Sequence, residues 1–269
     1  MKGRVLIAAG SDSGGGAGIQ ADIKAVTALG GFAMTAITAL TAQNTLGVHG
    51  IHPVDIEFVS QQMRVVLDDL GADCIKTGML HNTEVIETVV EVLTDRAADV
   101  PLVADPVMVA KGGAKLLGDD AHAAMVALLL PRATLLTPNA PEAAALTGLD
   151  VEDEAGQHRA GEALLKLGVG AALIKGGHVP GKDVVDLLVT PEETVRFVDS
   201  RIDSANTHGT GCTLASATAA GVAQGLALKD AVGRARKYVR AAILSAPGYG
   251  GGHGHLDHAV TFDPARIDS

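Results

Sequence analysis

Aromatic side chains are scarce in this sequence of 269 residues, because Trp does not occur and Phe, Tyr and Trp together make up 2%. Proteins that bind single-stranded nucleic acid stack bases on such rings, and phosphate backbones attract an excess of Lys and Arg. Here 21 basic residues stand against 31 acidic ones, which gives a net charge of −10. We therefore expect no nucleic-acid partner, and any phosphate should be bound locally.

Cysteines and long apolar segments are also lacking. Cys74 and Cys212 cannot build the framework of a disulfide-stapled secreted domain or a zinc site. The apolar run of residues 5–9 is shorter than the roughly 7–15 residues of a signal peptide's core. Residues 25–54 carry no Asp, Glu, Lys or Arg, but glycines and polar residues interrupt the roughly 20 apolar residues that a spanning helix requires. These absences predict a cytoplasmic protein that does not enter membranes.

Apolar residues, at 47%, are abundant enough for a large core. Short apolar runs typical of buried parallel strands occur at residues 5–9, 34–41, 74–77, 102–104, 135–137 and 171–174. Segments with helical spacing, such as residues 56–70 and 228–243, lie between such runs or follow them. This alternation predicts one α/β domain over residues 1–269, with a central, mostly parallel, doubly wound sheet and helices on both faces. Ligands of such sheets bind beyond the carboxyl ends of the strands.

Two segments near the C-terminus depart from the alternating pattern. Residues 184–190 and 194–202 flank a Pro-Glu-Glu turn and predict an antiparallel hairpin at the sheet edge. From Pro247 onward the chain is rich in glycine and contains three histidines. We expect this tail to be at least partly mobile, with its histidines solvated or at the rim of a nucleotide pocket rather than holding a metal.

A glycine-rich loop, residues 10–18, follows the first predicted strand. Residues 16–21 formally fit a dinucleotide-binding pattern, but Gly16 lies seven positions after Ala9, and no acidic residue between Asp22 and Asp55 is available for a ribose. We therefore expect no nicotinamide cofactor and interpret the loop as a cover over substrate. The alternative is a flexible connection, although ordinary connections rarely need so many glycines.

A second glycine-rich turn, residues 207–213, precedes a helix predicted over residues 214–224. The free N–H groups of Gly209, Thr210, Gly211 and Cys212, together with the helix dipole, would form a hole for a transferring phosphoryl group. A thiol at a helix N-terminus becomes a more available base, so Cys212 is a candidate proton acceptor. A closely packed helix start with an inert thiol fits the spacing equally well.

Four polar residues follow other predicted strands: Asp105, Asn139, Glu142 and Lys175. We expect them to project into one crevice, where Asp105 and Glu142 suit Mg²⁺ held through water and phosphate, and Lys175 neutralises phosphate charge. Each also has a purely structural explanation. Glu142 fits the first turn of a helix, Asp105 fits a turn, and a lone lysine usually faces solvent.

Asp22, Gln43 and Met79 complete the candidate set. The amide of Gln43 both donates and accepts hydrogen bonds, which suits the edge of an aminopyrimidine. An exposed Asp22 on a helix and a turn-forming Gln43 are the alternatives. Met79 either lines an apolar pocket or belongs to the core.

Together these motifs resemble the hydroxymethylpyrimidine/phosphomethylpyrimidine kinases of thiamine biosynthesis, within the ribokinase-like superfamily. The resemblance spans nearly the whole chain, and it is carried by residues 9–22, 41–45, 76–79, 105–108, 137–142 and 207–213. Gly14 replaces the serine of many relatives, which loosens the loop slightly. Cys212 stands where sugar kinases of the superfamily carry an Asp as general base, so it favours the pyrimidine kinases.

The resemblance implies transfer of the ATP γ-phosphoryl group to 4-amino-5-hydroxymethyl-2-methylpyrimidine and then to the resulting monophosphate. It implies ATP and Mg²⁺ as cofactors, a homodimer, and substrate contacts by Asp22, Gln43, Met79, Gly10, Ala17 and Val107. Asn139, Lys175 and Thr210 would meet the nucleotide phosphates. The nearest alternative is a pyridoxal or pyridoxine kinase of the same fold, against which Gln43 and Met79 argue. A non-catalytic pyrimidine sensor is a further alternative.

Overall fold

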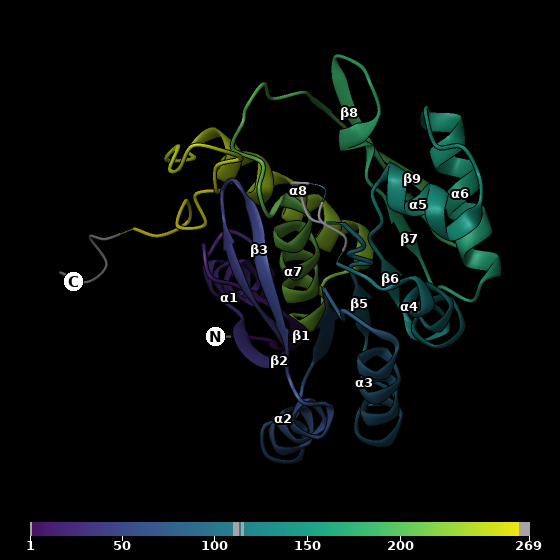
Figure 1. The fold of residues 1–269 in the computed structure, drawn as a ribbon. Helices are drawn as coiled ribbons and strands as arrows, with labels where there is room; N and C mark the ends of the chain where they lie inside the picture. The colour runs from purple at the N-terminus through teal and green to yellow at the C-terminus, as the bar shows by residue number, and fades with distance from the viewer. Residues whose placement is uncertain (1, 110–112, 114–115, 264–269) are drawn as a thin grey trace.

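The computed structural model describes residues 2–109, 113 and 116–263 (Figure 1). In this part of the chain nine strands form one sheet in the order β3-β2-β1-β4-β5-β6-β7-β8-β9. The central strands are parallel, namely β2 (Phe32–Asn44), β1 (Arg4–Asp12), β4 (Cys74–Thr77), β5 (Leu102–Ala104), β6 (Leu135–Leu136) and β7 (Ala172–Ile174). Antiparallel strands complete the edges, namely β3 (Gly47–Pro53) on one side and β8 (Asp183–Val189) with β9 (Thr194–Ser200) on the other.

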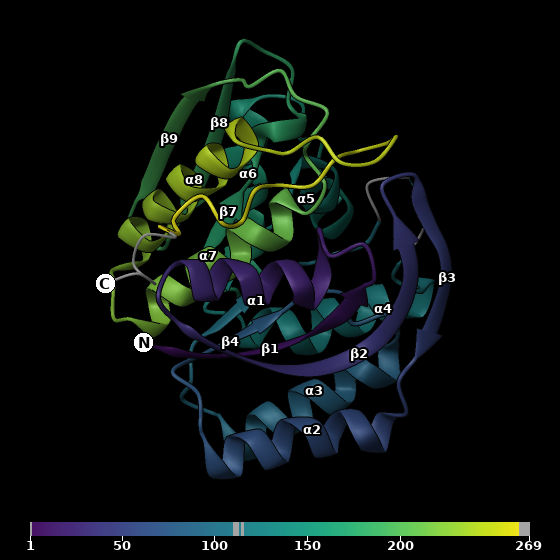
Figure 2. The same cartoon turned by 90° about the vertical axis from the view of Figure 1, so that its left-hand side faces the viewer.

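Helices cover both faces of the sheet because successive side chains of a buried strand point to opposite sides. Leu6 and Ala8 of β1 belong to one apolar cluster, whereas Val5, Ile7 and Ala9 belong to another. The first cluster is closed by α2 (Ile56–Asp69), α3 (Thr83–Arg96), α4 (Asp119–Ala124), α5 (Ala140–Thr147) and α6 (Glu154–Lys166). The second is closed by α1 (Gly18–Ala28), α7 (Thr210–Ala223) and α8 (Leu228–Leu244), which lie opposite α2 and α3 in Figure 2.

The predicted doubly wound sheet and its edge hairpin are therefore confirmed. The second hairpin, formed by β2 and β3, was not predicted, because Gly50 and Pro53 disfavour a strand by composition. Helix α7 begins at Thr210, four residues before the predicted start, because Gly209 has φ +80° and ends the preceding turn in the left-handed region. In the described residues no helix combines the length and the apolar character needed to cross a membrane.

The C-terminal tail is exposed over residues 247–251 and packed farther along, so the expectation of solvated histidines was wrong for His258. Leu256 and His258 are buried. The hydroxyl of Tyr238 on α8 donates to the carbonyl of His258 at 2.8 Å, and His258 Nε2 lies 2.9 Å from Thr213 Oγ1 on α7. Apolar burial and these two polar contacts hold this part of the tail against α7 and α8.

Candidate active site

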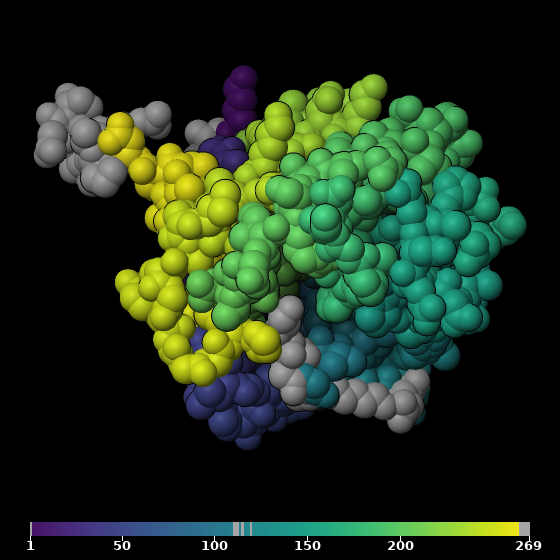
Figure 3. Space-filling view, turned by 90° about the horizontal axis from the view of Figure 1, so that it is seen from above, coloured from purple at the N-terminus to yellow at the C-terminus, as the bar shows by residue number. Residues whose placement is uncertain are grey.

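A cavity of about 770 Å³ opens beyond the carboxyl ends of the parallel strands. The space-filling surface seen from above shows a hollow between green segments and blue to teal segments (Figure 3). The cavity brings together nearly all of the predicted site residues, namely Gly10, Ala17, Gln43, Met79, Asp105, Val107, Asn139, Glu142, Lys175, Gly209, Thr210, Gly211 and Cys212. Asp22 does not line it.

The turn before α7 was predicted to form an anion hole, and it lies against the first glycine-rich loop. A Cβ on Gly209 would clash with the carbonyl oxygen of Gly16, so the two glycine-rich loops touch where a side chain has no room. The first N–H groups of a helix have no acceptor within the helix. The Thr210 N–H donates to the carbonyl of Thr207 at 3.4 Å. Gly211 and Cys212, the next residues of the first turn, line the cavity, where the helix dipole favours an anion such as a phosphate oxygen.

Cys212 lines the cavity on the first turn of α7. Burial raises the pKa of its thiol to about 12, although nearby Lys76 and the backbone N–H of Gly18 oppose the rise. The expectation that the helix N-terminus makes this thiol a more available base was therefore wrong for the free protein. Loss of solvent disfavours the thiolate more than the positive groups favour it.

Asp22 was predicted to contact substrate, but it lies beneath the cavity wall with no exposed surface. Its two carboxylate oxygens accept from Lys76 Nζ at 2.9 and 2.8 Å, and Ser216 Oγ donates to one of them at 2.7 Å. Burial, the largest single effect, lowers the pKa of Lys76, but Asp22 together with the nearby Cys212 and Asp105 outweighs it and raises the pKa, so the ammonium stays charged. Asp22 thus supports Lys76, which does line the cavity.

Lys76 was not singled out as a site residue from the sequence. A signal was present, because it is the one charged residue of a four-residue strand whose other members are Cys74, Ile75 and Thr77. A lysine in such a buried strand requires a partner of opposite charge. The sequence did not identify that partner.

Lys175 and Asp105 face the anion-hole turn together. Lys175 Nζ donates to Asp105 Oδ1 at 3.1 Å, and the same oxygen accepts from Thr137 Oγ1 at 3.1 Å. The position that a Cβ would take on Gly211 is 3.2 Å from Lys175 Nζ and 3.6 Å from Asp105 Oδ2. Burial by itself lowers the pKa of Lys175, but Asp105 and Glu142 outweigh it and raise the pKa, so a cation stands beside the turn.

Asn139 and Glu142 combine a structural role with a place in the cavity. Asn139 Oδ1 accepts from the backbone N–H of Glu142 at 2.9 Å, and Glu142 Oε2 accepts from that of Asn139 at 2.8 Å, which caps α5. Burial raises the pKa of Glu142 to about 7, with Lys175 opposing the rise. In the described residues no cluster of three or more His, Cys, Asp or Glu could hold a metal alone. Two carboxylates beside a phosphate site nevertheless fit Mg²⁺, which keeps several waters and binds phosphate oxygens.

The other side of the cavity is apolar and carries Met79 and Val107, two of the residues predicted to contact a substrate ring. Met79 packs with Ala39 and Leu116, and Val107 lies against the same cluster. A Cβ on Gly10 would come within 3.3 Å of Met79 Sδ, so both interpretations of Met79, as core and as cavity wall, are correct. Such a wall suits the face of a flat ring.

Asp12 organises the loop of residues 10–18. Its carboxylate accepts from the backbone N–H groups of Gly14, Gly16 and Ala17 at 2.8, 3.1 and 2.8 Å, and it lies 2.9 Å from His208 Nε2. Burial by itself raises the pKa of Asp12, but the hydrogen bonds from His208 and the loop amides outweigh it and lower the pKa. Neither Asp12 nor His208 was predicted as a site residue, although both line the cavity.

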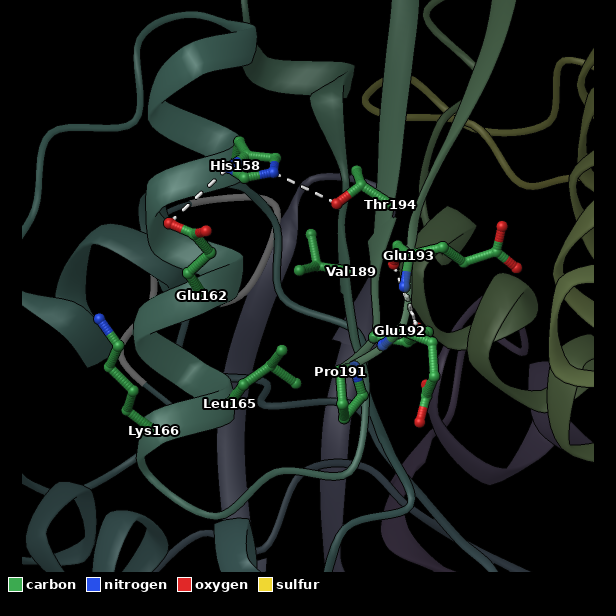
Figure 4. Close-up of a pocket in the computed structure, with 10 residues that line it drawn as sticks. His158, Glu162, Leu165, Lys166, Val189, Pro191, Glu192, Glu193 and Thr194 are labelled. Carbon is green, nitrogen blue, oxygen red and sulfur yellow. Dashed lines mark hydrogen bonds and ion pairs between the residues drawn. The ribbon is translucent and has the colours of Figure 1, made fainter.

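A second hollow, of about 650 Å³, lies between α6 and the turn joining β8 and β9 (Figure 4). His158 Nε2 is 3.2 Å from Thr194 Oγ1, and its Nδ1 is 3.8 Å from Glu162 Oε2. Glu162 and Thr194 are exposed and His158 is half-buried, and none of the predicted site residues lies there. The chemistry suggested by the sequence therefore belongs to the first cavity.

This chain is similar to known proteins over most of its length. The family profile described as phosphomethylpyrimidine kinase matches residues 12–257. The hydroxymethylpyrimidine/phosphomethylpyrimidine kinase of Streptomyces coelicolor is 50% identical over 254 residues, which cover 94% of this chain and 93% of that protein. The thiamine biosynthesis bifunctional protein ThiED of Geobacter sulfurreducens is 48% identical over 98% of this chain, which spans only 54% of that longer protein.

Solved structures confirm the fold. The phosphomethylpyrimidine kinase of Clostridium difficile superposes with a TM-score of 0.80 at 38% identity, covering 90% of this chain and 100% of that one. The pyridoxal kinase of Bacillus subtilis, solved as an ADP complex, superposes with a TM-score of 0.88 at 31% identity, covering 97% and 98% of the two chains. Fold similarity therefore extends to kinases of two different vitamins.

Proposed function

Because the chain belongs to the phosphomethylpyrimidine kinase family, we propose that it phosphorylates 4-amino-5-hydroxymethyl-2-methylpyrimidine with ATP and then phosphorylates the monophosphate to the pyrophosphate. The proposal rests above all on one observation. A single cavity holds an apolar wall and the Gln43 amide, which suit an aminopyrimidine, together with an anion-hole turn flanked by Lys175.

In the proposed reaction the substrate hydroxyl attacks the γ-phosphorus in line with the leaving oxygen of ADP. The amides from Gly209 to Cys212 and the ammonium of Lys175 stabilise charge on the transferring group. Bound Mg²⁺, held by Asp105 and Glu142 through water and phosphate, would add charge neutralisation. Gln43, Met79, Val107, Gly10 and Ala17 would orient the ring.

Cys212 is our candidate for the group that receives the hydroxyl proton. Since burial keeps its thiol protonated at neutral pH, only the small thiolate fraction can accept that proton. A loose phosphoryl-transfer transition state depends mainly on positioning and charge stabilisation. We therefore expect Cys212 to contribute less than the anion hole. In the second step the acceptor is already a phosphate, which requires no base.

The direct test is ADP release with Mg-ATP and the pyrimidine, with products identified by mass and pyridoxal run in parallel. Monophosphate followed by pyrophosphate is the expected result. Monophosphate alone would limit the protein to one step, and ligand binding without ADP release would indicate a sensor. Protein with Lys175→Ala serves as the matched control, because it keeps the ring wall but loses the cation beside the turn.

Pyridoxal is the second candidate substrate, favoured by the TM-score of 0.88 to a pyridoxal kinase. The sequence relatives weigh against it as the main substrate, because the Streptomyces coelicolor kinase at 50% identity is named for the pyrimidine. Phosphorylation of pyridoxal with no turnover of the pyrimidine would reverse this order.

We also propose a homodimer in the cytoplasm. Strand β2, next to the edge strand β3, and the turn between these two strands expose Phe32, Leu40 and Leu46, with Leu46 68% accessible. Apolar side chains along an edge suit burial against a second copy. Cys74 and Cys212 are both unpaired, as in proteins of reducing compartments. Light scattering at elution from a sizing column tests the dimer.

A further inference from the structure

His208 Nε2 faces two groups at once. It lies 2.9 Å from Asp12 Oδ2 and 3.2 Å from Gln43 Nε2. His208 and Asp12 are buried, at 6% and 2% exposure, so neither contact can be exchanged freely for water. The chemistry of the Gln43 amide therefore depends on which atom of the imidazole carries a proton.

The Asp12 carboxylate determines which nitrogen of the His208 ring carries the proton. Three backbone N–H groups of the substrate loop donate to it, which keeps it ionised and able only to accept. His208 Nε2 must then carry a hydrogen and donate it to Asp12. An Nε2–H cannot accept a hydrogen bond, so it cannot pair with the NH₂ group of Gln43 3.2 Å away.

Thr41 imposes the same requirement from the other side of the amide. Its hydroxyl donates to the carbonyl of Ser11 at 2.8 Å, which uses its only hydrogen. The hydroxyl oxygen also lies 3.2 Å from Gln43 Oε1, which can therefore only share the hydrogen that already goes to Ser11. A half-turn of the amide places Nε2 toward Thr41, whose oxygen accepts from it, and Oε1 toward His208, where it shares the single Nε2 hydrogen with Asp12 in a three-centre bond.

We propose that the Asp12–His208 pair is a specificity-determining device that holds Gln43 with its carbonyl toward His208 and its NH₂ toward Thr41. After these two bonds the amide keeps one N–H donor and one oxygen lone pair for a ligand in the cavity. The orientation of the amide fixes which of its two sides presents the donor and which presents the acceptor. An aminopyrimidine edge, with a ring nitrogen beside an amino group, complements this donor–acceptor pair. Pyridoxal has no amino group beside a ring nitrogen and cannot use both. This inference deepens the proposed function. Its conclusion about the substrate rests on that function, whereas its conclusion about the hydrogen-bond network of Asp12, His208 and Gln43 does not.

The network is tested first in the wild-type protein without ligand. Long-range ¹⁵N–¹H spectra of the imidazole should show a proton on His208 Nε2. The side-chain NH₂ signals of Gln43, identified by their loss in Gln43→Ala, should show contacts to Thr41 rather than to the His208 ring. An unprotonated Nε2, or NH₂ protons beside the ring, would overturn the inference whether or not the protein is a kinase.

Kinetics test the consequence for specificity. His208→Leu removes the donor and should raise KM for the aminopyrimidine about 10-fold, the effect of one mismatched hydrogen bond, with a smaller change in kcat and in KM for pyridoxal. His208→Gln, which supplies an N–H at similar reach, should restore most of the loss. His52→Leu removes an exposed histidine of β3 and is the matched control.

An equal rise in KM for both substrates, or a His208→Gln variant as impaired as His208→Leu, would show that His208 acts only structurally. Turnover of neither substrate by the wild type would refute the proposed function, while the spectra would still decide the network.

Discussion

Replacing Lys76 by Met tests how strongly the stability of the fold depends on the buried ion pair between Lys76 and Asp22. Lys76 and Asp22 are both fully buried, and the ammonium contacts both carboxylate oxygens. Without Lys76, only the hydroxyl of Ser216 among these partners remains for Asp22. Removing one member of a buried pair typically costs about 3–5 kcal/mol, a large part of the roughly 5–15 kcal/mol by which a domain is stable.

The cost should also depend on pH. Burial already raises the pKa of Asp22, and loss of Lys76 removes the strongest group that opposes this rise. Above the ordinary pKa of an aspartate, the folded variant therefore keeps a proton on Asp22, whereas the unfolded chain releases it. Stability of the variant relative to wild type then falls as pH rises, by about 1.4 kcal/mol for each unit between the two pKa values. The variant should be closest to wild type in mildly acidic buffer.

Urea denaturation followed by far-ultraviolet circular dichroism measures these effects, since the chain has no Trp. The double variant Asp22→Asn/Lys76→Met should be more stable than Lys76→Met alone, because it leaves no unpaired charge. Arg196→Met, which breaks an exposed pair with Glu154, should leave the midpoint nearly unchanged. A cost below about 1 kcal/mol for Lys76→Met, or strictly additive losses in the double variant, would refute the reasoning.

Other predictions follow from the same geometry. Cys212→Ala should lower kcat by no more than about 100-fold, measured as initial rates of ADP release; complete loss would show that the thiol is indispensable. Gly209→Ala should abolish ADP release and lower the melting temperature, because its Cβ would strike the Gly16 carbonyl; a fully active variant would contradict that contact. Burial lowers the pKa of His258 from 6.5 to about 4, so the unfolded chain binds its proton first and stability should fall as pH drops through this range. That loss, up to about 3 kcal/mol at about 1.4 kcal/mol per unit, should be absent in His258→Gln in urea titrations. Iodoacetamide should alkylate Cys212 slowly near neutral pH and faster as pH rises toward the thiol's pKa of about 12, with the extent of alkylation measured by mass spectrometry. An alkylation rate that stops rising near the pKa of an ordinary thiol, about 8.5, would refute the raised pKa.

Local patterns in the sequence were sufficient to predict the parallel centre of the sheet and the edge of the sheet at which the candidate residues meet. Strands β4 and β5 match the expected residues 74–77 and 102–104, because short apolar runs bounded by polar residues have few other stable arrangements. The glycine-rich turn before α7 was likewise visible, since consecutive small residues before an apolar run indicate a helix start. The carboxyl ends of parallel strands then had to bring these motifs to one edge of the sheet.

Which charged and polar groups pair with one another was decided only by the tertiary structure. Lys76 and Asp22 are 54 residues apart, and His208 and Asp12 are 196 residues apart. No local pattern links such partners, because their proximity depends on how strands and helices stack. The same folding placed the half-buried Cys212 thiol where loss of solvent raises its pKa, although its place at a helix N-terminus alone favours the opposite shift. Residue type and spacing determined which chemistry is available, whereas burial and long-range pairing determined the charge state of each group.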